Sequence, residues 1–445
     1  MYPRSSVLRS AVRSYASLAR EQPLVAAKAH KTVSKTSAGV KVATYDEGGP
    51  ASSLAVVLKA GSRYESPDAP GAAHLLKTSL VRAVPGDNIV RTILEAELRG
   101  NSLYTSVGRE QLTIGSEFLR DDLVDAVPSL LSHVFNSSFH AYEFLDARAK
   151  AIEESTASLA DPRTKVIEAL HHIAFRSGLG NSVLASPAAA KALKRAHLQE
   201  FASKLFTSDR IAVVGTGIAH EDLTALVESS LASLTLSAGT AATAASKYFG
   251  GETRFDAGPA APAHYAVAFP SASFASADYA ASLVLRAYLD SSSRVKWGSP
   301  SGVTGLLSSA ASADVTVSSL AASYSDAGLI GFYLTGPSAH IGGVASKALK
   351  TVKTAGAGFT AEHLARAKKA AIVDAEADFS RETKLQDVAR SVLTNGTFST
   401  SEELAAAVNK VTVADVQKLL TGISVSKPSI VALGNLSQLP FADQL

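Results

Sequence analysis

The sequence contains no cysteine, and several kinds of functional site are excluded by that absence. A disulfide framework, a thiolate zinc site, a cysteine nucleophile and a cysteine-ligated iron–sulfur cluster all need thiols. The chain also lacks a run of 18 apolar residues, so we expect no segment that spans a bilayer, and membrane association only through partner proteins. With 43 basic and 40 acidic residues and no long basic block, nucleic-acid binding is not expected.

The composition that is present is typical of globular domains. The chain has 445 residues, of which 46% are hydrophobic and 19% charged, so it exceeds the size of one usual core. Residues 197–215 and 413–434 share the order helix, loop, strand, glycine, and residues 235–247 have the composition of a linker. We therefore predict two homologous α+β domains, at residues 16–234 and 248–445, each a mostly antiparallel sheet covered by helices.

The first twenty residues, MYPRSSVLRSAVRSYASLAR, contain four arginines, five serines and no acid. Leu8, Val12, Tyr15 and Ala19 fall on one face of a helix, and the arginines lie off that face. This pattern predicts a mitochondrial transit peptide over residues 1–15. Arg13-Ser14-Tyr15-Ala16 resembles a matrix-protease cleavage pattern, which would start the mature chain at Ala16. The alternative is a basic disordered tail.

The most informative stretch is residues 71–79, GAAHLLKTS, whose apolar spacing predicts a helix after a strand-like run. A His-x-x-Glu-His motif here would place two imidazoles and a carboxylate on one helical face, as zinc peptidases require. The sequence instead has His74 followed by Lys77 and Thr78, so a cation replaces the general base and a hydroxyl replaces a ligand. On these residues alone, an ordinary core helix unrelated to a metalloprotease is the better explanation of the motif.

The flanking segments change that interpretation. VVLKAGSRYE at 56–65 and RGNSLYTSVGREQLTIGSEFL at 99–119, together with GAAHLL, resemble the pitrilysin and mitochondrial-processing-peptidase family. The resemblance implies a processing-peptidase-like fold and places the family's third zinc ligand at Glu154. Because catalytic zinc needs at least three protein ligands and water needs a base, His74 and Glu154 alone cannot supply the chemistry. We expect no catalytic residue, no metal and no cofactor in this degenerate site.

Further family segments lie in the second half, notably SYSDAGL at 323–329, whose alternative explanation is a plain strand pair, and PFADQL at the end of the chain. They resemble the core subunits within this family. The resemblance implies a non-catalytic structural subunit on the matrix side of mitochondrial ubiquinol–cytochrome c reductase, in a dimeric complex, with core protein 1 and cytochrome b as partners. It places the chain at the inner membrane as a peripheral protein.

Two other functions remain to be weighed. A non-catalytic α subunit of the processing peptidase would carry a long glycine-rich loop, but residues 291–305 have only isolated glycines. An active zinc peptidase conflicts with Lys77 and Thr78.

Two lesser motifs carry no chemistry. His171 and His172 are adjacent on a predicted helix and point roughly 100° apart, so they cannot easily bind one ion. Gly215-Thr216-Gly217 follows a strand, but His220 stands where a dinucleotide fingerprint has its third glycine, which favours a simple strand-to-helix turn.

Overall fold

The structure is a computed structural model, and it describes residues 30–46, 49–80, 89–135, 139–232, 239, 243–259, 261–290, 305–312, 314–377 and 381–445. The predicted transit peptide, most of the predicted linker and most of residues 291–305 lie outside the described residues. Among the helices that are described, none is long and apolar enough to cross a membrane.

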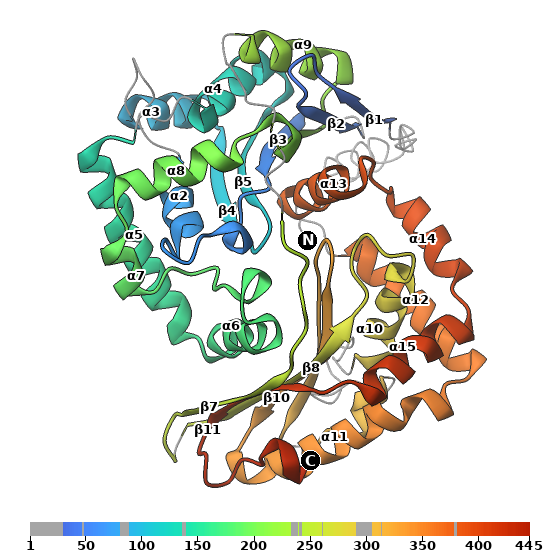
Figure 1. The fold of residues 1–445 in the computed structure, drawn as a ribbon. Helices are drawn as coiled ribbons and strands as arrows, with labels where there is room; N and C mark the ends of the chain where they lie inside the picture. The colour runs from blue at the N-terminus through green and yellow to red at the C-terminus, as the bar shows by residue number, and fades with distance from the viewer. Residues whose placement is uncertain are drawn as a thin grey trace, which may run out of the picture.

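The first half is built on a six-stranded sheet with the strand order β1-β2-β6-β3-β5-β4 (Figure 1). Its strands are β1 (His30–Lys35), β2 (Lys41–Asp46), β3 (Ala51–Leu58), β4 (Ser102–Val107), β5 (Leu112–Leu119) and β6 (Ile211–Thr216). Its helices are α2 (Ala72–Leu80), α3 (Ile89–Arg99), α4 (Leu123–Phe135), α5 (Ala141–Ala160), α6 (Pro162–Phe175), α7 (Pro187–Ala192), α8 (Arg195–Leu205) and α9 (His220–Leu231). All strand pairs are antiparallel except β2 with β6.

The second half has a five-stranded sheet with the order β7-β11-β8-β10-β9. Its strands are β7 (Gly251–Asp256), β8 (Ala263–Ser271), β9 (Thr316–Ser323), β10 (Gly328–Gly336) and β11 (Ser429–Gly434), and its helices are α10 (Tyr279–Leu289), α11 (Ser338–Gly358), α12 (Ala361–Ala377), α13 (Arg381–Asn395), α14 (Ser401–Lys410) and α15 (Val413–Val425). In each half the last strand, β6 or β11, pairs parallel with one early strand and antiparallel with another. The prediction of two repeated α+β domains with mostly antiparallel sheets is confirmed.

Each sheet buries both of its faces, because one helix from each half covers the sheet of the other half. One face of β3 (Leu54, Val56, Leu58) packs in the core of its own half, whereas Ala55 and Val57 pack against α13. Side chains alternate along a strand, so burial on both faces explains why β3 reads as an almost continuous apolar run.

The two covering helices both use apolar residues spaced three or four positions apart. On α13, Leu385, Ala389 and Val392 face the first sheet, and on α6, Val166, Leu170 and Ala174 face the second. Residues at these intervals share one face of a helix. A polar contact adds to the apolar ones, since the Lys41 ammonium donates to the Val392 carbonyl at 2.9 Å, near the C-terminal end of α13.

Candidate functional site

The degenerate motif lies at the start of α2, where the backbone is held closely. Gly71 has φ +85°, and a Cβ there would collide with Ala185, so the turn before α2 requires glycine. The Glu65 carboxylate accepts the backbone N–H groups of Gly71 at 2.8 Å and Ala73 at 2.9 Å, which satisfies donors of the first helical turn. Burial raises the pKa of Glu65 to about 7 although these two hydrogen bonds act to lower it. This turn fixes the position of His74.

His74 is buried, and its hydrogen bonds define its tautomer. The Ala185 backbone N–H donates to His74 Nδ1 at 3.3 Å, so Nδ1 carries no proton. Nε2 therefore carries the proton of the neutral ring and donates it to Glu154 Oε2 at 3.2 Å. Burial, with the nearby charge of Lys77, holds the pKa of His74 below its usual value. The neutral imidazole thus presents a proton, not a lone pair, toward Glu154.

Glu154 lies on α5 and accepts a second hydrogen bond at the same oxygen. The Lys77 ammonium donates to Glu154 Oε2 at 2.7 Å. Burial acts to raise the pKa of Glu154, but the hydrogen bond and charge of Lys77, helped by His74, bring it below the usual value. The carboxylate is therefore ionised, and a side chain of the same site neutralises it.

Thr78, at the fourth position, is turned into the packing between α2 and α5. Its hydroxyl lies 2.9 Å from the Leu75 carbonyl and 3.2 Å from the Ala147 carbonyl, to either of which it can donate. The structure thus brings His74, Lys77 and Glu154 into contact and leaves Thr78 as a structural group.

This donor set does not fit a zinc ion. The four positions offer one imidazole, whose Nε2–H faces Glu154, and one carboxylate that an ammonium already holds. Over the described ranges, no group of three His, Cys, Asp or Glu side chains is placed to hold a metal. A cation at the position of the general base also cannot take a proton from water.

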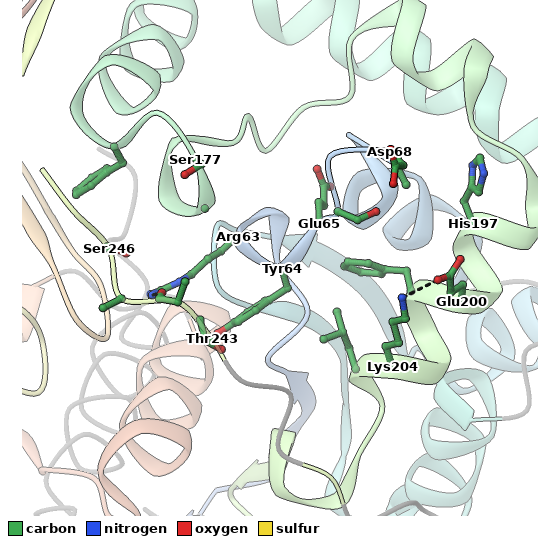
Figure 2. A pocket seen from close by; sticks show the side chains of 18 of the residues that line it. Arg63, Tyr64, Glu65, Asp68, Ser177, His197, Glu200, Lys204, Thr243 and Ser246 are labelled. Atoms are coloured by element: carbon green, nitrogen blue, oxygen red, sulfur yellow. Dashed lines mark hydrogen bonds and ion pairs between the residues drawn. The ribbon is translucent and has the colours of Figure 1, made fainter. Parts of the chain in front are cut away.

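A cavity of about 780 Å³ opens beside the N-terminal end of α2 (Figure 2). Its charged and polar lining comes from the segment after β3 (Tyr64, Glu65, Asp68), from α8 (His197, Glu200, Lys204) and from the segment that enters the second half (Thr243, Ser246). Glu200 and Lys204 pair with each other at 2.6 Å. His74, Lys77 and Glu154 do not line this cavity, so the degenerate site and the cavity are separate features.

The two halves meet at an ion-pair cluster that we call the joint, formed by Arg63, Glu110, Ser325 and Asp326, in which Arg63 is buried and Asp326 reaches the surface. The Arg63 guanidinium contacts Glu110 at 2.6 Å and binds both oxygens of Asp326, at 2.8 Å and 2.5 Å. The Ser325 N–H donates to the second oxygen of Glu110 at 2.9 Å. A bidentate arginine–carboxylate pair fixes geometry as well as contributing energy. The joint therefore sets how the two sheets face each other.

Next to the joint, Tyr324 reaches α6. Its hydroxyl lies 2.8 Å from His171 Nε2, and His171 Nδ1 lies 2.8 Å from the Ile167 carbonyl. A carbonyl only accepts, so Nδ1 holds the proton of His171 and Tyr324 donates to Nε2. Burial lowers the pKa of His171 to about 3. This geometry agrees with the structural role that we predict for His171.

The residues of the joint were not singled out by the sequence, although they lie inside the segments that carry the family resemblance. Arg63 and Glu110 stand among polar and charged neighbours, in KAGSRYE and VGREQ, so the local sequence did not mark them for burial. Their partner could not be deduced, because Asp326 is 263 residues from Arg63. SYSDAGL does belong to a strand pair, β9 and β10, but its turn also makes the contact with the first half.

Comparisons with known proteins support this description. Residues 41–187 match the model of the family described as insulinase (peptidase family M16), and residues 192–371 match the model described as the peptidase M16 inactive domain. The chain is 35% identical to "Cytochrome b-c1 complex subunit 2, mitochondrial" of Cryptococcus neoformans, over 93% of this chain and 95% of that protein. It is 30% identical to the protein of the same name from Yarrowia lipolytica, over 96% of this chain and all of the relative.

A solved structure shares the fold. A chain of "Complex III2 from Candida albicans, Inz-5 bound" superposes with a TM-score of 0.80 at 20% identity, covering 93% of this chain and 98% of the other. The sequence matches and the doubled sheet-and-helix architecture lead to the same conclusion: the chain belongs to the insulinase family of peptidases, peptidase family M16.

Proposed function

We propose that this chain is core protein 2 of mitochondrial ubiquinol–cytochrome c reductase, a non-catalytic structural subunit that supports respiratory electron transport. Similarity to the curated relatives over nearly the full length of both chains supports this assignment. Its partners are then the other subunits of complex III, notably core protein 1 and cytochrome b, and the complex is dimeric. The chain attaches peripherally, on the matrix side of the inner membrane.

The observation that carries the non-catalytic part of the proposal is the contact between Lys77 and Glu154. One ammonium replaces the general base and neutralises the remaining carboxylate ligand, so the site has lost both functions at once. We propose that no residue of the degenerate site is catalytic and that none holds a metal. The chain then contributes to the complex through its surfaces.

The domain limits belong to the same proposal. A transit peptide over residues 1–15 is removed to leave Ala16, and residues 16–234 and 248–445 are the two peptidase-like domains, joined by residues 235–247. Sequencing the N-terminus of the protein from mitochondria tests the first limit. A retained Met1 would contradict both the targeting segment and the compartment.

The decisive experiment is native electrophoresis of detergent-solubilised mitochondrial membranes that contain the tagged chain. Comigration with cytochrome b is expected. A soluble heterodimer with a zinc-containing subunit would instead identify the alternative, the non-catalytic α subunit of the processing peptidase. Zinc content and presequence cleavage, measured on the purified chain before and after chelation, test the lost chemistry separately.

A further inference from the structure

Two cavities in the second half share a wall, and they are distinct from the degenerate site. The larger has a volume of about 560 Å³ and the smaller about 310 Å³. Tyr279 and Arg390 line both of them, so a molecule that passes these two side chains would occupy both spaces.

The smaller cavity is cationic. Arg286 and Arg390 both line it, together with Ser271, Ser282 and Ser323, and among the described lining residues there is no Asp or Glu. Within the part of the chain that the structure describes, Arg286 forms no ion pair. The field of these two arginines also acts to lower the pKa of Tyr279, which burial raises overall. The cavity therefore offers positive charge and hydroxyl groups to a ligand.

The Arg390 guanidinium contains a buried N–H group that has no acceptor among the described residues. One terminal nitrogen pairs with Asp387 at 2.9 Å, and the other donates to the Ser323 carbonyl at 3.3 Å. Its Nε is buried and has no acceptor among the described residues. A buried donor without a partner is unfavourable, and an acceptor atom of a ligand would satisfy it.

The larger cavity combines apolar and polar surface. It lies among α13, α14 and residues 274–280. Phe274, Val388, Phe398, Leu404 and several alanines supply its apolar part, and Lys384, Asp387, Asn395 and several serines and threonines also line it. The Arg390 guanidinium stacks 4.2 Å from the centre of the Phe274 ring, at the boundary with the smaller cavity. Its volume is within the range of about 300–1,000 Å³ that is common for small-molecule sites.

We propose that the two cavities form one binding site for a single-chain anionic amphiphile. The phosphate or carboxylate headgroup binds Arg286 and the free donor of Arg390, and the alkyl chain lies along the apolar lining of the larger cavity. Guanidinium groups match the fork geometry of both kinds of oxyanion, and apolar surface favours the chain. This site is independent of the proposed function, because none of its residues takes part in the degenerate motif or the joint.

Isothermal titration of the purified full chain tests the proposal, with dodecyl phosphate below its micelle concentration as the probe. We expect saturable binding of one molecule, and similar binding of dodecanoate. Inorganic phosphate and dodecanol should each bind at least about tenfold more weakly, because each keeps only half of the contacts. If inorganic phosphate binds as tightly as dodecyl phosphate, the site is only an anion site. If dodecanol binds as tightly as dodecyl phosphate, the site is only an apolar pocket. Either result overturns the proposal.

Two variants examine the two ends of the site. Arg286→Gln, at an exposed position of α10, should lower the affinity for dodecyl phosphate about five- to tenfold, since it removes one charge-assisted contact. Arg366→Gln makes the same charge change on the exposed face of α12 and should leave the affinity unchanged. Ala375→Phe fills the larger cavity. It should lower the affinity for dodecyl phosphate but not the affinity for inorganic phosphate. Thermal unfolding checks that each variant is folded, and unchanged affinity in either test variant overturns the proposal.

Discussion

At the scale of single residues, the degenerate motif can be rewritten. Lys77→Glu with Thr78→His restores, with His74 and Glu154, the ligands and base that the family resemblance implies. We expect the double variant to gain zinc affinity but to cleave presequence peptides poorly, because turnover also needs partners that orient each ligand and position substrate. Zinc titration beside a cleavage assay measures both. Efficient turnover would show that the surroundings had stayed organised for catalysis.

His171 gives a pH prediction whose sign follows from its hydrogen bonds. In the folded protein the pKa of His171 is about 3, so the ring stays neutral above that pH, whereas in the unfolded chain histidine binds a proton near its ordinary pKa of 6.5. The unfolded state therefore holds more protons between these values, and this group's contribution to stability falls as the pH drops below 6.5. The slope is at most about 1.4 kcal/mol per pH unit.

Urea unfolding at several pH values between 7 and 4.5 measures that slope. His171→Gln should reduce it, and His172→Gln should not, since the neighbouring histidine is exposed. Equal slopes in the wild-type chain and His171→Gln would contradict the assignment.

At the scale of elements, α13 is the cover of the first sheet. Leu385→Ala should lower the free energy of unfolding by about 2–5 kcal/mol, because Leu385 is fully buried against β3 and β6 and its removal leaves a cavity. Val373→Ala on α12 is the control, since that side chain is 53% exposed. A loss for Leu385→Ala no larger than that of the control would mean that α13 is loosely attached.

Most elements were predictable from the sequence because their patterns are local. The residue patterns at 111–118 and 141–159 predict a strand and a helix, and β5 and α5 match them closely. The pattern at 265–269 predicts a strand that ends in Pro270, and β8 runs one residue further, to Ser271. The covering roles of α6 and α13 could not be predicted, because an apolar helical face does not identify the sheet that it will cover.

The candidate site, too, was predictable where it depends on local sequence and not where it depends on distant partners. His74, Lys77 and Glu154 were predicted as one site from motif spacing and family resemblance, and the structure places them in contact. The tautomer of His74 could not be foreseen, because the Ala185 N–H that fixes it is 111 residues away. The joint was missed for the same physical reason: its partners come from opposite halves of the chain.

At the scale of the whole molecule, the joint should hold the two halves together. Asp326→Asn removes the charge that binds Arg63, which is almost completely buried, and also weakens the contact with the Ser246 N–H at 2.8 Å. We expect a loss of about 1–3 kcal/mol in the free energy of unfolding and faster proteolysis near residues 243–247. Asp314→Asn, at an exposed carboxylate of the same half, is the control. Identical proteolysis rates in the two variants would show that the covering helices alone fix the halves.

The exchange of covering helices also determines what a growing chain exposes. When synthesis or import proceeds from the N-terminus, the first sheet is complete at β6, but the helix that shields its second face has not yet emerged. The Lys41 ammonium, for example, donates to the Val392 carbonyl, which lies 351 residues further along the chain and is made much later. After β6 ends at residue 216, another 165 residues must follow before α13 begins at residue 381, which takes roughly 8–33 s at about 5–20 residues per second. During this interval the nascent first half presents an apolar sheet face to its surroundings, and it therefore depends on chaperones until its own C-terminal half arrives.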